Sequence, residues 1–430
     1  MPGTTQIEST VNHLFRHQAG KMVAVLTRIF GVRNLELAED VVQDTLIAAL
    51  EQWKIQGIPD KPESWLFIVA KNKALNLIKK QKTNILFGDD DTQPLLQSGY
   101  TLETTFNQLA EDEYIKDDQL RMMFACCHPE ISPENQVTLI LKTLCGFSTA
   151  EIAKAFLTSE DTVSKRLYRT KEFFRQNKIK LVIPNTGEIK KRTETVLNTL
   201  YLLFNEGYNS TQAEELIRTD VMEEAMVLCK LLTQNILTQL PEVYALMALM
   251  YFHASRSNSR LTAEGEMILL PMQDRSKWNR AFIEEGNSCM NKAAFGNAVT
   301  SFHLEAAIAF EHCTAESFEK TNWSKIIYYY DWLYKLSPSP ITELNKTVAI
   351  MQAQGAAAAL QALENIHDKR KLESYYIYYS LLGEIHARLL NKTEAFKNFE
   401  AAINLTRSAV ERKMLRNKIV SLESIAPAQQ

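Results

Sequence analysis

Two clusters of basic side chains stand out in a chain of 430 residues whose formal net charge is −3. Because the chain as a whole is not basic, any contact with nucleic acid must come from such local clusters. Lysine and arginine neutralise backbone phosphates, and polar side chains among them can bond to base edges. The first cluster comprises Lys71, Lys73, Lys79, Lys80 and Lys82, and the second comprises Lys165, Arg166, Arg169, Lys171, Arg175, Lys178 and Lys180.

The second cluster falls on the second helix of a predicted helix-turn-helix over residues 146–171, with Ser159 as the expected N-cap. A major groove accepts one such helix, so its polar tips could contact bases. From this segment alone, a helical hairpin with a solvated basic face is the alternative interpretation. The predicted inward stripe comprises Val163, Leu167, Thr170 and Phe174, and the candidate DNA-binding residues are Thr162, Lys165, Arg166 and Arg169.

The first cluster falls on a predicted helix over residues 64–82, whose other side is apolar. Single-stranded bases need a surface to stack on and cations along their backbone. Trp65 shares the polar face, but a role as a core anchor is the preferred interpretation because aromatic residues near helix starts usually pack inward. The candidate DNA-binding residues of this helix are Asn72, Lys73, Asn76, Lys79 and Lys80.

An acidic, polar face is predicted on an earlier helix that contains Asp40, Gln43 and Asp44. Residues four apart share a helix face, so the two carboxylates form one exposed patch that suits a basic partner. An ordinary solvated face is the alternative. The opposite face carries the apolar stripe Val42, Leu46, Ala49 and Trp53.

The pattern of apolar residues along the whole chain indicates an all-α protein. We expect a helical domain over residues 1–85, an acidic linker over 86–111, a helix-turn-helix domain over 112–182 and a helical domain over 188–425. No apolar run approaches the roughly 18–20 residues that span a bilayer, and no signal sequence is evident, so we expect a cytoplasmic protein without membrane contact.

Enzymatic chemistry has no support in the residue pattern. Phosphate-binding glycine loops, nucleophile elbows and metal-ligand motifs are missing, so we expect neither catalysis nor a cofactor. The run from Cys126 to His128 contains metal-ligand residue types, but adjacent helical residues point about 100° apart and rarely hold one ion. We therefore expect no metal.

Two further segments accompany the helix-turn-helix in the order typical of one family. Residues 38–45 (AEDVVQDT) resemble region 2.2 of sigma factors, and residues 62–74 (PESWLFIVAKNKA) resemble their regions 2.3 and 2.4. The chain is thus similar to extracytoplasmic-function (ECF) sigma factors of the sigma-70 family. The alternative, from another class, is an interaction adaptor built on tetratricopeptide repeats whose helix-turn-helix serves no sigma function.

The resemblance implies a partner for each surface. Asp40, Gln43 and Asp44 would bind the β′ clamp helices of core RNA polymerase. The helix over residues 64–82 would recognise the minus-ten element of promoter DNA. The helix-turn-helix would recognise the minus-thirty-five element and contact the β flap.

The C-terminal part resembles a sigma-factor subgroup with a tetratricopeptide-like helical extension, on the basis of residues 118–129, 201–208, 274–278 and 338–340. Near its end, Gly383, His386, Ala395, Phe399 and Ala402 partly fit the ~34-residue repeat of helical hairpins. Such domains bind peptides on concave surfaces, so a regulatory protein is the expected partner. Residues 201–208 are interpreted as a buried helix end capped by Gly207, and a ligand or partner contact is the alternative.

Overall fold

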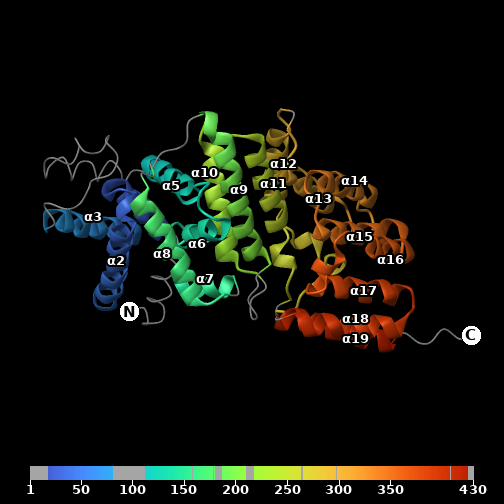
Figure 1. Ribbon diagram of the computed structural model, residues 1–430. Coiled ribbons are helices and arrows are strands. Elements are labelled where there is room, and N and C mark those ends of the chain that lie inside the picture. Colours follow the sequence, from blue (N-terminus) through green and yellow to red (C-terminus); the bar gives the residue numbers. More distant parts are fainter. Residues whose placement is uncertain are drawn as a thin grey trace, which may run out of the picture. The chain divides into compact units, whose positions relative to one another are not determined.

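The computed structural model describes residues 18–80, 112–156, 158–177, 179, 186–209, 217–262, 265–296, 298–406 and 408–424 (Figure 1). Within these residues the regular structure is helical, apart from an isolated antiparallel bridge between Leu261 and Met267. This finding confirms the all-α class. The predicted acidic linker over residues 86–111 lies outside the described residues, as do Lys82, Lys178 and Lys180.

Contacts within the chain divide it into two compact units. Unit 1 comprises Met1–Leu203 with Glu223–Thr238, and unit 2 comprises Phe204–Met222 with Gln239–Gln430. The finer domain boundaries expected from the sequence remain predictions.

The first described residues of unit 1 are helical residues 18–30, and this helix ends at Gly31, which has a left-handed conformation with φ 81°. Most of α9 and most of α10, the last two helices given in the next sentence, belong to this unit. Its elements are η1 (Val32–Asn34), α2 (Leu35–Gln56), α3 (Pro62–Lys80), α5 (Asp112–Cys126), α6 (Pro133–Thr143), α7 (Thr149–Ala155), α8 (Glu160–Gln176), α9 (Thr186–Tyr208) and α10 (Thr219–Gln234).

The core of unit 1 joins its N-terminal helices to the helices that follow residue 112. The predicted apolar stripe of α2 is buried in full, and Trp53 is 2% exposed. At Gly20 a Cβ atom would lie 1.9 Å from the carbonyl oxygen of Leu144, so only glycine allows this approach to the end of α6. Arg28 also forms a 2.9 Å ion pair with Asp118, whose side chain is fully buried. The N-terminal helices and the helix-turn-helix therefore form one packed unit.

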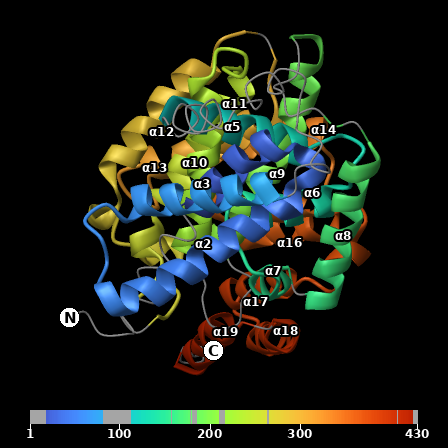
Figure 2. The same cartoon turned by 90° about the vertical axis from the view of Figure 1, so that its left-hand side faces the viewer.

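Unit 2 is built from consecutive helices and short 3-10 turns. The last three helices lie side by side in both views (Figures 1 and 2). The α-helices are α11 (Pro241–Ala254), α12 (Arg280–Ala293), α13 (Ser301–Thr314), α14 (Trp323–Leu336), α15 (Pro340–Gln354), α16 (Ala356–Glu364), α17 (Tyr376–Arg388), α18 (Lys392–Leu405) and α19 (Ala409–Ser424). The 3-10 turns are η3 (Ser257–Ser259), η4 (Leu270–Met272), η5 (Arg275–Lys277) and η6 (Lys369–Leu372).

The hairpin expected near the C-terminus is formed by α17 and α18. A Cβ atom at Gly383 would lie 2.6 Å from ring atoms of Phe399, so the small residue lets that ring pack against α17. Ala395 and Ala402 are fully buried beside Phe399. The spacing of small and aromatic residues therefore predicted this hairpin correctly.

The interpretation of Gly207 as a helix cap is wrong. The helix α9 continues through Tyr208, and Gly207 is not among the residues with positive φ. A Cβ atom at Gly207 would instead lie 2.4 Å from the backbone nitrogen of Met222, near the start of α10. Glycine is needed there because two backbones meet. Phe204 and Tyr208 are buried, as expected for a buried helix end.

Candidate nucleic-acid interface

The helix α8 has the local structure that its sequence predicts. Its N-cap is Ser159, whose Oγ accepts a hydrogen bond of 3.1 Å from the backbone N–H of Thr162. This cap satisfies one of the free donors at the helix start and fixes where the helix begins. The buried residues of the helix are Val163, Leu167, Thr170 and Phe174, which is the predicted inward stripe.

The four candidate DNA-binding residues of α8 lie outside this stripe. Lys165 and Arg169 are exposed, whereas Thr162 and Arg166 are half-buried. Lys165 forms a 2.6 Å ion pair with Asp161 one turn earlier, and both side chains are largely in solvent. Such exposed pairs are weak, so Lys165 can exchange this partner for a phosphate at little cost.

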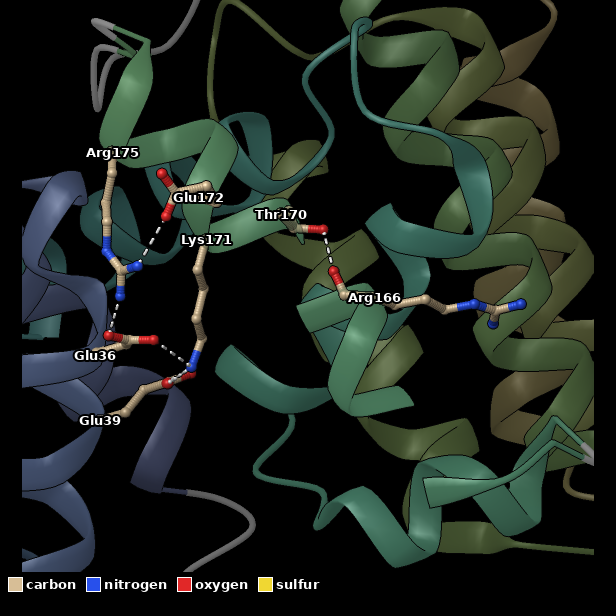
Figure 3. A network of polar contacts seen from close by, with 7 residues as sticks. All are labelled: Glu36, Glu39, Arg166, Thr170, Lys171, Glu172 and Arg175. Carbon is tan, nitrogen blue, oxygen red and sulfur yellow. Dashed lines mark hydrogen bonds and ion pairs between the residues drawn. The ribbon is translucent and has the colours of Figure 1, made fainter. Parts of the chain in front are cut away.

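Two basic residues near the end of α8 contact carboxylates of α2 (Figure 3). Lys171 Nζ lies 2.6 Å from Glu39 Oε2, and both side chains are only 15% exposed. Arg175 contacts Glu36 and also donates a 3.0 Å hydrogen bond to Glu172. In the same view Arg166 points away from these carboxylates. The second basic cluster therefore has two parts, one directed outward and one held by α2.

Sequence reasoning missed this contact between α2 and α8. Glu36 and Glu39 stand three residues apart at the start of α2, next to the candidate polymerase-binding patch. Their spacing was a signal for a shared acidic face. Nothing in the sequence indicated that the partner would be a lysine 132 positions away.

The candidate polymerase-binding residues lie together on α2. Asp40, Gln43 and Asp44 are all exposed, on the side opposite the buried stripe. Ile47, one turn after Asp44, is 47% exposed and adds an apolar contact surface that the sequence reasoning did not single out. Charged groups around an exposed apolar residue are typical of a protein-binding surface.

The candidate residues of α3 are described only in part. Asn72 and Asn76 are exposed and Lys73 is half-buried, while the side chains of Lys79 and Lys80 lie outside the described residues. The ring of Trp65 lies 5.3 Å from that of buried Trp53 in an edge-on contact. This packing supports the interpretation of Trp65 as a core anchor.

The cysteine and histidine run from Cys126 to His128 is not arranged around one point. Cys126 Sγ lies 3.6 Å from Thr143 Oγ1, whereas Cys127 Sγ lies 3.7 Å from Thr199 Oγ1. Burial raises the pKa of Cys127 to about 12 and also raises the pKa of Cys126, so both thiols keep their protons. Among the described residues, no group of three or more His, Cys, Asp and Glu side chains could hold a metal ion.

Comparison with protein families places these elements in a known order. Residues 14–83 match sigma-70 region 2, and residues 121–174 match sigma-70 region 4. Residues 192–294 match a family of unknown function. The region 2 match includes α2 and α3, and the region 4 match ends within α8.

The chain is also similar to whole proteins, two of which are named as sigma factors. The uncharacterized protein R00370 of Rhizobium meliloti is 32% identical over 397 residues, which cover 92% of each chain. The ECF RNA polymerase sigma factor SigL of Mycobacterium tuberculosis is 31% identical over 30% of this chain and 68% of its own. RNA polymerase sigma factor SigV of Bacillus subtilis is 28% identical over 34% of this chain and 77% of its own. No solved structure matches the chain.

The chain is a member of the sigma-70 family. Within that family it is an ECF-type sigma factor with a C-terminal helical extension, the arrangement that it shares with the Rhizobium relative. Family membership implies core RNA polymerase and promoter DNA as partners and points to a protein that is not an enzyme. In the described part of the chain, no helix is long and apolar enough to cross a bilayer.

Proposed function

We propose that the protein is a sigma factor that directs core RNA polymerase to specific promoters, and that its C-terminal extension regulates this activity through protein contacts. The observation that carries the first part is α8. It is a capped helix with its apolar face buried and its polar face outward, and a region 4 match that follows a region 2 match covers all of it but its last two residues.

We assign a partner to each of the candidate surfaces on α8, α3 and α2. On α8, Lys165 and Arg169 with half-buried Thr162 and Arg166 would recognise the minus-thirty-five element. On α3, Asn72, Lys73 and Asn76, together with Lys79 and Lys80, would bind the minus-ten element. On α2, Asp40, Gln43 and Asp44 would bind the β′ clamp helices, and the region 4 domain would contact the β flap.

The regulatory role of the extension is supported by exposed aromatic side chains in unit 2. Tyr328 is 58% exposed, Trp332 is 37% exposed and Leu336 is 47% exposed. They follow one another at intervals of four residues on α14, so they share one helix face. Aromatic residues are enriched at protein–protein contacts. A protein partner for this face accounts for their exposure.

In vitro transcription with purified core polymerase and a genomic library tests the sigma function. We expect the protein to produce transcripts from defined start sites that core polymerase alone does not produce. Raising the salt concentration should weaken promoter binding steeply, because each neutralised phosphate releases counterions. An adaptor that binds only proteins would yield no new start sites, and that result would refute the proposal.

A chain that ends after Thr238 tests the role of the extension. This cut retains every residue of unit 1, whereas a cut near Pro184 would remove from unit 1 the parts of α9 and α10 that belong to it. We expect the shortened protein, once circular dichroism shows it to be helical, to differ from the full chain in transcript yield. Equal yields, together with no protein captured by full-length chain through unit 2, would rule out the regulatory role.

A further inference from the structure

Three arginine side chains gather in unit 2 around the end of α11. Arg256 follows α11, Arg260 follows η3 and Arg275 begins η5. The Cζ atoms of Arg256 and Arg275 lie 5.8 Å and 4.4 Å from the centroid of the Trp278 ring. The Cζ atom of Arg260 lies 4.0 Å from the centroid of the Tyr208 ring. Two segments that the sequence analysis singled out, residues 201–208 and 274–278, thus meet at this cluster.

The hydrogen bonds of these arginines go to neutral acceptors. Arg256 donates to the Tyr208 hydroxyl at 2.7 Å, and Arg260 donates to the Tyr208 carbonyl oxygen. Arg275 donates to the carbonyl oxygens of His312 and Ala315, each at 2.8 Å.

Within the described part of the chain, no carboxylate forms an ion pair with any of the three arginines. Exposed Glu319 is close enough to Arg275 to favour its charged form, but it makes no salt bridge with it. Three positive charges therefore share one cluster without a bound counter-charge.

Several donor atoms of the cluster are buried without an acceptor among the described residues. They include Nε of Arg256, Nη2 of Arg275 and Nε1 of Trp278, whose side chain is 3% exposed. Nδ1 of His253 and of His312 is buried in the same way. Buried polar atoms are normally hydrogen-bonded, and leaving one unpaired costs roughly 1–3 kcal/mol, more if it is charged.

The two histidines add no positive charge. Burial, followed by the nearby arginines, lowers the pKa of His312 to about 3 and that of His253 well below its ordinary value. The ring of His253 also packs 4.7 Å from that of Tyr208. Both imidazoles are neutral at physiological pH, so each can still donate or accept one hydrogen bond at Nδ1, depending on its tautomer.

We propose that Arg256, Arg260 and Arg275 form a binding site for a small divalent oxyanion of the phosphate type, either free phosphate or the phosphoryl group of a small metabolite. The planar guanidinium group matches the spacing of two such oxygens. A divalent anion suits three positive charges better than a single carboxylate. The unpaired donor atoms of Arg256, Arg275 and Trp278 are buried, which favours a small ligand over a nucleic-acid duplex. The site goes beyond the sigma function and does not depend on it.

Titration of the full-length protein with inorganic phosphate, followed by its melting temperature and by calorimetry, tests this site. We expect the melting temperature to rise and to saturate with phosphate and with sulfate, and to rise much less with acetate at the same ionic strength. The variant Arg256→Gln should lose at least about tenfold in phosphate affinity, since it removes a charge-assisted donor. The matched control Lys277→Gln alters an exposed cation of the neighbouring turn η5 and should bind as the wild type does.

A phosphorylated sugar in the same titration distinguishes the two sources. Tighter binding than that of phosphate assigns a metabolite, and weaker binding assigns free phosphate. If Arg256→Gln does not fold, Arg260→Gln serves as the second variant. An unsaturable response of the wild type, or an equal response to acetate and phosphate, overturns the site. Neither measurement involves polymerase, so failure here leaves the sigma function untouched.

Discussion

Arg169 and Lys165 share the outward side of α8, while Lys171 and Arg175 on the same helix are engaged with carboxylates of α2. This difference in surroundings decides what each cation can do. An exposed guanidinium keeps all of its donors available for a base edge or a phosphate. Lys171, whose ion pair with Glu39 is mostly buried, must first give up that partner, whereas the pair of Lys165 with Asp161 lies in solvent.

Replacing Arg169 with alanine should weaken promoter binding by roughly 1–3 kcal/mol if the side chain contacts a base, or reduce the salt dependence by about one ion if it contacts a phosphate. Arg416→Ala, which removes an exposed arginine from α19, is the matched control. Fluorescence anisotropy with a promoter fragment and the holoenzyme measures the promoter affinity of each variant and its salt dependence. An equal loss of promoter affinity in the two variants would show that only the net charge of the protein matters.

The Cys127 thiol makes the free energy of unfolding of unit 1 decrease at alkaline pH. Burial raises its pKa from the ordinary 9.0 to about 12, so the unfolded chain releases this proton first as the pH rises. The contribution of the protonated Cys127 thiol to the free energy of unfolding is complete below pH 9. It is lost between about pH 9 and pH 12, at up to about 1.4 kcal/mol per pH unit. Chemical denaturation from pH 8 to 11 should therefore show a steeper fall for wild type than for Cys127→Ala. Parallel curves would contradict this cause.

At the scale of elements, the acidic residues of α2 fall into two groups with different contacts. Glu36 and Glu39 contact α8, and exposed Asp40 and Asp44 form the patch proposed for polymerase. The pair between Glu39 and Lys171 is the best shielded of these contacts, since both side chains are mostly buried. We expect this pair to stabilise the packing of α8 against α2. Its contribution should exceed that of the exposed pair between Lys165 and Asp161 to the stability of α8.

Reversing charges tests this contact. Lys171→Glu should increase hydrogen exchange at the end of α8, and adding Glu39→Lys should restore protection, with a coupling energy of about 1 kcal/mol. The exposed pair gives the control, because Lys165→Glu with Asp161→Lys should couple by only about 0.3–0.5 kcal/mol. A double variant no better protected than Lys171→Glu alone would mean that the ion pair does not fasten the helices.

The elements themselves could be predicted because their signals are local. The stripe on α8 and its Ser159 cap follow from spacing within a few turns, and the structure has both. The contact between Glu39 and Lys171 could not be predicted, because each looks like an ordinary solvated charge on its own helix. Gly207 was misassigned for a different reason. A helix cap and a close backbone contact both require the absence of a Cβ atom, and only the fold distinguishes them.

At the scale of the whole molecule, the two compact units have separate tasks in this account. Unit 1 contains the two sigma-70 matches and all of the surfaces proposed for polymerase and promoter DNA. Unit 2 contains the arginine cluster around Trp278 and the exposed aromatic face of α14. We therefore expect changes in unit 2 to alter regulation or ligand binding, and changes in unit 1 to alter recruitment itself.

Direct association of the purified protein with core RNA polymerase tests the central claim. At about 0.1 M salt, where surface charges still attract over about 10 Å, we predict a stable one-to-one complex. Asp40→Lys with Asp44→Lys should weaken it at least about tenfold, because a basic partner would then be repelled. Glu194→Lys with Glu223→Lys changes the same charge elsewhere on unit 1 and should leave it intact. Failure of the wild type to bind core polymerase under these conditions would contradict the account.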